Sequence, residues 1–85
     1  MGGTLDAVVA FGRVLRRLRT QAGLTQEQLG FDANLRRTYI STLELGQQEP
    51  SLGTIFKLAR ALKQPVHEVI GMVEAELKQA GRGRR

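Results

Sequence analysis

Residues 25–46 read TQEQLGFDANLRRTYISTLELG, and they predict two short helices joined by a tight turn. Thr25 and Gln28 form the Thr-x-x-Gln pattern of a capping box, which starts the first helix, over about 26–32. Asn34 stands where the turn needs a left-handed residue, a conformation that asparagine adopts more readily than most residues. The stretch is therefore typical of a helix-turn-helix pair.

The second helix of the pair runs from 36 or 37 to about 45, and Gly46 ends it. Ile40 and Leu43 are its buried positions, about one turn apart. Its other positions are rich in basic and hydroxyl side chains, and none before Leu43 is acidic. A short turn that presents such a helix is one way in which a small protein places side chains in the DNA major groove.

Further helices are expected on both sides of this pair. Apolar residues recur with helical spacing in three more segments, about 5–22, 52–62 and 65–79. Ser51 caps the second of these segments, Pro65 opens the third, and Gly81 ends it. The sequence thus predicts an all-α fold, a compact five-helix domain over 5–80 between a flexible N-terminus, 1–4, and a basic disordered tail, 81–85.

The charge of the chain favours a polyanionic partner. Its 85 residues suffice for one domain and carry a formal net charge of +5, from 13 basic and 8 acidic residues. The arginines gather in three clusters: Arg13, Arg16, Arg17 and Arg19, then Arg36 and Arg37, then Arg82, Arg84 and Arg85. The first two clusters accompany the helix-turn-helix pattern, so we expect them to bind phosphates.

Composition argues against several classes of protein. The chain has no cysteine and one histidine, His67, so we expect no disulfide, no metal site and no cofactor. Paired carboxylates at catalytic spacing are also missing, and we expect no enzymatic activity. Without a signal-peptide pattern or an apolar run of membrane-spanning length, a cytoplasmic, nucleoid-associated protein with no membrane partner is expected.

Several motifs follow one another over about 11–70: LRTQAGLTQ at 18–26, YIS at 39–41, LE at 43–44, Gly46, PSL at 50–52 and LARAL at 58–62. Their order resembles that of the phage-repressor and Cro-like helix-turn-helix family, also called the XRE family. The resemblance implies a lambda-repressor-like domain that binds double-stranded DNA as a homodimer, with the second helix of the pair in the major groove. The segment 34–41 is also similar to the controller proteins of restriction-modification systems and to other stand-alone regulators.

Five residues are candidates for contacts with bases. By resemblance, Arg37, Thr38 and Thr42 take the base-facing positions of the second helix, and Ser41 lies beside them. Arginine bidentate to guanine is the commonest specific contact in the major groove, and threonine offers a hydroxyl and a methyl group. Gln26, at the start of the first helix, matches a family position that contacts a phosphate or an outer base of the half-site.

Four residues are candidates for contacts with phosphates, namely Arg16, Thr25, Arg36 and Tyr39. Such contacts position a protein on DNA without reading its sequence. Two of them have structural alternatives, because Thr25 caps a helix and Tyr39 can pack between helices. The chain also departs from the family pattern: Arg36 replaces the usual Ser or Thr cap, and Gly30 replaces the usual Ala.

Two other sets of residues have structural roles. By resemblance, Arg19 and Glu44 form a buried ion pair that fixes the second helix of the pair on the scaffold. The last helix is longer than the family domain needs, which suggests a dimer interface. Its candidate residues are Val69, Met72, Val73 and Leu77, and the alternative is that they pack in the chain's own core.

Together these observations predict a sequence-specific transcriptional regulator, a repressor or an activator, that binds near-palindromic operators as a dimer. The alternative is an antitoxin or another protein-interaction module that uses its last helix or its tail to bind a partner protein. A toxin or RNA polymerase would then be a further partner.

Overall fold

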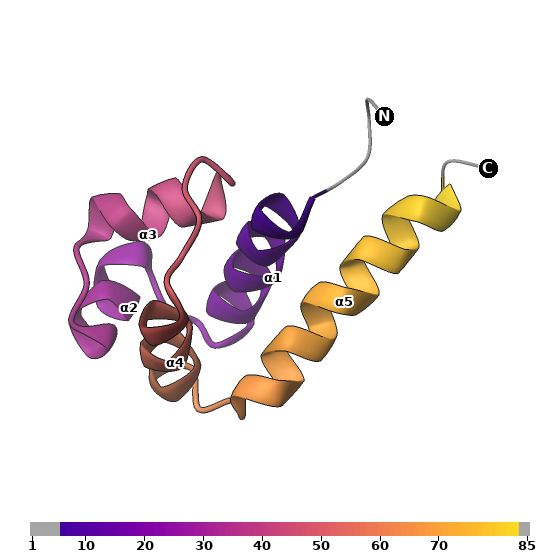
Figure 1. Cartoon of the computed structure of the whole chain (residues 1–85). Helices are drawn as coiled ribbons and strands as arrows, with labels where there is room; N and C mark the ends of the chain where they lie inside the picture. The colour runs from indigo at the N-terminus through magenta and orange to yellow at the C-terminus, as the bar shows by residue number, and fades with distance from the viewer. Residues whose placement is uncertain (1–5, 84–85) are drawn as a thin grey trace.

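The computed structural model describes residues 6–83 and contains five α-helices (Figure 1). They are α1 (Ala7–Gln21), α2 (Gln26–Ala33), α3 (Arg37–Glu44), α4 (Leu52–Ala61) and α5 (Val66–Gly83). The predicted all-α, five-helix fold is confirmed, and α2 and α3 are the predicted helix-turn-helix pair. No helix in the described range is both long enough and apolar enough to cross a membrane.

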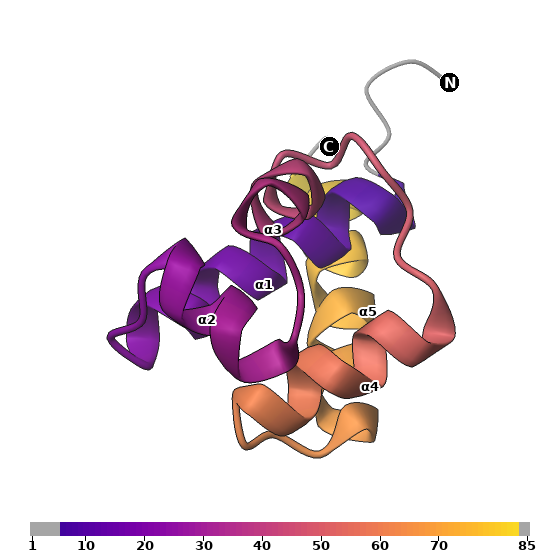
Figure 2. The same ribbon diagram turned by 90° about the vertical axis from the view of Figure 1, so that its left-hand side faces the viewer.

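Helix α1 lies in the middle of the molecule, with α5 on one side and α3 on the other (Figure 1). Helix α2 packs against α3 and α4, and α4 in turn packs against α5 (Figure 2). All five helices contribute to one apolar core, which consists of Ala10, Phe11, Val14, Leu15, Leu18, Leu29, Ala33, Ile40, Leu43, Leu58, Ala59, Leu62, Val69 and Val73. This core holds α3 by its inner face only.

Side-chain caps begin three of the helices. Thr25 and Gln28 make both bonds of the predicted capping box: the Gln28 N–H donates to Thr25 Oγ1 at 3.0 Å, and the Thr25 N–H donates to Gln28 Oε1 at 2.8 Å. Ser51 caps α4 as predicted, and Asp6, which the sequence analysis missed, caps α1. Each such cap stabilises a helix by about 1 kcal/mol. Arg36 gives α3 no side-chain cap.

The turn between α2 and α3 is tight and depends on two residue types. Asn34 has φ of 59°, the left-handed conformation predicted for it. The Leu35 N–H then donates to the Gly30 carbonyl at 2.8 Å. A Cβ added at Gly30 would lie 2.6 Å from the Leu35 carbonyl oxygen, closer than real Cβ contacts. The backbone of this turn therefore leaves no room for a Cβ at position 30, where the resembled family usually has alanine.

Helix α5 continues to Gly83, so the prediction that Gly81 ends it is wrong by two residues. Glycine inside an exposed helix costs only about 1 kcal/mol relative to alanine, and it ends a helix chiefly where it turns left-handed. Gly23 and Gly46 do so just after α1 and α3, with φ of +75° and +70°. Two predicted segments lie wholly or partly outside the described residues, the N-terminus, 1–4, and the tail, 81–85.

Lys63, in the turn between α4 and α5, has φ of +58°. This conformation costs a non-glycine residue about 1–2 kcal/mol. Glycine adopts this conformation without that cost. The unfolded state of a glycine variant is more flexible, however, and this offsets part of the gain in stability. We therefore expect Lys63→Gly to raise the free energy of unfolding by about 0.5–1 kcal/mol, as measured by urea unfolding.

Lys57→Gly is the matched control for this prediction. Lys57 is also an exposed lysine, but it lies inside α4. Its replacement by glycine should lower the free energy of unfolding by about 1 kcal/mol. Equal losses in the two variants would mean that the turn at Lys63 stores no strain.

Candidate nucleic-acid interface

Helix α3 has a buried face and an exposed face, as its sequence predicts. Ile40 and Leu43 are fully buried in the core. Arg37 and Thr38 are exposed in its first turn, and Arg36 is exposed directly before them. The structure thus brings two guanidinium groups and a hydroxyl to the N-terminal end of one short, firmly held helix.

The other predicted contacts on α3 are less exposed. Thr42, Ser41 and Tyr39 are all half-buried, and Tyr39 packs against the core. The Thr42 hydroxyl donates to the Thr38 carbonyl at 2.8 Å. Since this bond uses its proton, Thr42 can offer a base an acceptor oxygen and a methyl group, but no second donor.

The N-terminus of α2 lies next to the end of α3. The Gln26 Nε2 donates to the Glu44 Oε1 at 3.0 Å. A carboxylate only accepts hydrogen bonds, so this contact fixes the amide orientation and directs the NH₂ of Gln26 to Glu44. The second N–H of that amide and the Oε1 remain, so Gln26 keeps one donor and one acceptor side for DNA. Thr25 accepts from the Gln28 N–H, which leaves its own hydroxyl proton to donate to a phosphate.

Glu44 also forms the predicted ion pair with Arg19, and the pair is well buried. The Arg19 Nε donates to Oε2 at 2.6 Å and Nη2 donates to Oε1 at 3.1 Å. The two side chains are 13% and 4% exposed, Arg19 first. The Nη1 of Arg19 donates to the Leu24 carbonyl at 2.8 Å. One carboxylate therefore connects α1, the start of α2 and the last turn of α3.

The charge state of this pair follows from its geometry. The hydrogen bond that Arg19 donates to Glu44 raises the pKa of its guanidinium. Burial acts in the opposite direction, and the negative charge of Glu44 raises the pKa further. Arginine is charged throughout the ordinary pH range, so the pair keeps its cation wherever the protein is folded.

Three arginines of the first cluster have carboxylate partners, and the buried pair of Arg19 with Glu44 removes Arg19 from the predicted phosphate-binding group. Arg13 and Arg17 lie 3.7 and 3.3 Å from the Glu76 carboxylate on α5. Both guanidinium groups are largely exposed, so these pairs stabilise the packing of α1 on α5 only slightly. Arg16 is exposed and stays a candidate for a phosphate contact.

Two of the predicted dimer-interface residues belong to the core. Val69 and Val73 are buried between α5 and the rest of the chain, which corrects their assignment as interface residues. Met72 and Leu77 are half-buried and pack against the same core. The large apolar side chains that are exposed in the described residues are Phe31, Leu45, Leu52, Phe56 and Ile70, the last of them on α5.

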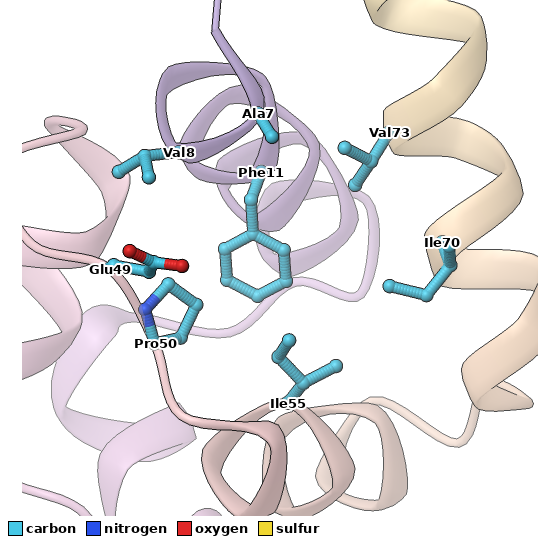
Figure 3. Close-up of a pocket in the computed structure, with 8 residues that line it drawn as sticks. All are labelled: Ala7, Val8, Phe11, Glu49, Pro50, Ile55, Ile70 and Val73. Atoms are coloured by element: carbon cyan, nitrogen blue, oxygen red, sulfur yellow. The ribbon is translucent and has the colours of Figure 1, made fainter.

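An apolar pocket of about 130 Å³ lies between α1, α4, α5 and the loop before α4 (Figure 3). Its walls include Val8, Phe11, Pro50, Ile55, Ile70 and Val73. Glu49 supplies the one titratable side chain of the lining. Acid–base catalysis needs at least one positioned pair of proton donor and acceptor, and this lining has Glu49 alone. The apolar walls suit an apolar group.

Comparison with known proteins gives the same family as the motifs. A family model described as Helix-turn-helix matches residues 15–69. The control protein C.BamHI of Bacillus amyloliquefaciens is 42% identical over 53 residues, which are 61% of this chain. The chain spans 65% of the length of that relative.

Two solved structures are also similar. The restriction-modification controller protein C.AhdI from Aeromonas hydrophila is 47% identical with a TM-score of 0.71, over 73% of this chain and 94% of that one. The controller protein C.Esp1396I, solved as a tetramer in complex with its natural 35 base-pair operator, is 25% identical with a TM-score of 0.79. That match covers 86% of this chain and 96% of the other.

Proposed function

Because the chain belongs to the helix-turn-helix family, whose model spans residues 15–69, we propose that it is a sequence-specific transcriptional regulator that binds double-stranded DNA. It acts in the cytoplasm as a homodimer on near-palindromic operators, and it has no enzymatic activity. The control and controller proteins among its relatives support this role, and one of them is bound to its own operator.

The geometry of α3 is the observation that carries the proposal. Its inner face is anchored by Ile40 and Leu43, while Arg37 and Thr38 are exposed in its first turn. Recognition helices of this motif contact base edges with their N-terminal residues. A helix anchored along one side can keep those side chains in register with the bases.

Each candidate contact has a distinct chemical role. Arg37 offers the fork of donors that matches the O6 and N7 of guanine. Thr38 and Thr42 read a base edge or a thymine methyl group, and Ser41 lies beside them. The free Oε1 of Gln26 accepts from the amino group of adenine or cytosine. Arg16, Thr25, Arg36 and Tyr39 contact phosphates and position the protein.

The first experiment compares the DNA directly upstream of this protein's own gene with scrambled DNA of equal length, at about 0.15 M salt. Specific sites bind at least about 1000-fold more tightly than non-specific DNA in proteins of this kind, so we expect a difference of that order. Footprinting should then find a near-palindromic site. Equal, weak binding to both DNAs would contradict the proposal for this DNA and favour a protein partner.

Arg37→Ala tests the base contact directly. We expect it to weaken binding to the specific site by about 1–3 kcal/mol, roughly 5- to 150-fold, and to change binding to scrambled DNA little. Arg60→Ala, which removes an exposed arginine from α4, should leave both affinities unchanged. If Arg37→Ala weakens both DNAs equally, Arg37 contacts a phosphate and not a base.

A further inference from the structure

The apolar pocket between α1, α4, α5 and the loop before α4 has no part in the proposed contacts with DNA (Figure 3). Four separate segments of the chain enclose it, and two residues of its walls, Phe11 and Val73, belong to the core. The pocket is thus held in shape by the packed helices. A pocket with apolar walls and a single polar group is typical of a site for a small molecule.

The size of the pocket determines the apolar part of its ligand. Its volume is about 130 Å³. An apolar cavity of about 150 Å³ binds benzene, so one aromatic ring or a short alkyl group is the largest group that this space accepts. The side chains of Phe11, Ile55 and Ile70 offer no hydrogen-bonding atom, so a polar group among them would lose its bonds to water without replacement. The group that enters must therefore be apolar.

Glu49 determines the polar part of the ligand. It is the one charged residue of the lining, and Figure 3 shows its carboxylate beside Pro50, on the side of the pocket that faces Phe11. Glu44 and Glu76 pair with arginines, whereas Glu49 has no such pair among residues 6–79, whose side chains the structure describes. A carboxylate only accepts hydrogen bonds, and it binds a cationic donor most strongly. The lining therefore suits a ligand with a positive charge next to its apolar group.

We propose that this pocket binds a small aromatic amine in its cationic form: the ring enters the apolar space, and the ammonium group donates to the Glu49 carboxylate. An aromatic ring is favoured over an alkyl group because Phe11 lines the space, and a pair of aromatic rings contributes more than the area that it buries. The net charge of +5 repels cations, but salt screens this repulsion beyond about 8 Å, so the contact with Glu49 prevails. None of the candidate DNA contacts lines the pocket, so this inference does not depend on the proposed function.

Titration of the full chain with benzylamine, a cation at neutral pH, tests the proposal without DNA. We expect the methyl NMR signals of Ile55, Ile70 and Val73 to shift together and to saturate, with a dissociation constant of about 1 mM, as for other ligands of this size. Benzyl alcohol has the same ring and a neutral head. It should bind about 3- to 5-fold more weakly than benzylamine, the upper part of the range for an exposed ion pair.

Glu49→Gln tests the ion pair, because it removes the charge and keeps the shape of the side chain. It should bind both ligands with the affinity that the wild type has for benzyl alcohol, so the preference for the amine is lost. Glu74→Gln is the matched control, since Glu74 is an exposed glutamate on α5 that does not line the pocket, and it should keep the preference. The proposal is overturned if Glu49→Gln still prefers the amine, or if both variants lose the preference equally.

Ile70→Phe tests the location of the ring. Ile70 is 43% exposed, so a larger side chain can fill the pocket without overpacking the core, and the helical circular dichroism spectrum should be kept. Binding of both ligands should be lost. The proposal is overturned if this variant binds like the wild type, or if the wild type shows no saturable shift up to about 20 mM ligand. It is also overturned if the same methyl signals change only on dilution of the protein, since a second copy would then fill the pocket.

Discussion

We expect Glu44→Ala to lower the free energy of unfolding by about 3–5 kcal/mol. The side chain of Glu44 is 4% exposed and accepts hydrogen bonds from Arg19 and Gln26. Its removal leaves the guanidinium of Arg19 buried without its anion, and this uncompensated charge accounts for most of the loss. Small domains are stable by only about 5–15 kcal/mol, so the variant should be close to unfolding at ambient temperature.

Urea unfolding and thermal melting followed by circular dichroism measure this effect. Glu74→Ala is a matched control, since Glu74 is an exposed glutamate on α5 and its removal should change stability by less than about 0.5 kcal/mol. Equal melting temperatures for the two variants would refute the structural role of the pair. In addition, Arg19→Met combined with Glu44→Leu should recover much of the lost stability, because a buried ion pair and an apolar pair of similar size are often equivalent.

Gly12→Ala should lower the free energy of unfolding by about 3 kcal/mol, the upper part of the usual range for overpacking. Gly12 is buried where α1 crosses the last turn of α3. A Cβ at this position would collide with the Leu43 carbonyl oxygen and would lie 2.8 Å from that of Glu44. Both obstacles are backbone atoms, so they cannot move aside as a flexible side chain would. Relief of the clash requires α1 and α3 to separate.

Gly71→Ala is the control that isolates this clash. Gly71 lies inside α5, and a Cβ added there meets no atom within 4 Å. Alanine favours a helix over glycine by about 1 kcal/mol, so this variant should be more stable than the wild type. The same substitution should thus lower the free energy of unfolding at position 12 and raise it at position 71. A stabilised Gly12→Ala variant would show that the backbones of α1 and α3 leave room for a Cβ at Gly12.

Local signals in the sequence predicted most of the fold because their causes are local. The capping box of Thr25 and Gln28 spans four positions, and the left-handed turn at Asn34 depends on one residue. The burial of Ile40 and Leu43 follows from helical periodicity alone. Gly81 is the exception, because a glycine is compatible with an exposed helix and α5 passes through it.

Contacts between distant parts of the chain were harder to predict. Nothing near Glu76 in the sequence indicates that it contacts Arg17, which is 59 positions away. The family resemblance supplied the pair of Arg19 and Glu44, but not the bond from Gln26 that completes the group. That bond changes the chemistry of the candidate site, since it fixes the orientation of the glutamine amide and uses one of its two N–H donors.

The burial of Val69 and Val73 in the chain's own core was missed for a related reason. Periodicity identifies which side of a helix is apolar, but not which neighbour covers it. The stripe that contains Val69 and Val73 is covered by the chain itself, as α5 packs along α1. The apolar residues left exposed, such as Leu52 and Phe56, lie at the edge of the α4 stripe and are not distinguishable from core positions in the sequence.

The exposed first turn of α3 has a consequence for how such a regulator acquires new target genes. Stability resides in the core and in the group around Glu44, whereas Arg36, Arg37 and Thr38 are exposed. Exchanges at exposed positions usually change stability by less than about 0.5 kcal/mol. Operator preference can therefore drift, or be reprogrammed by design, one side chain at a time without an intermediate that fails to fold.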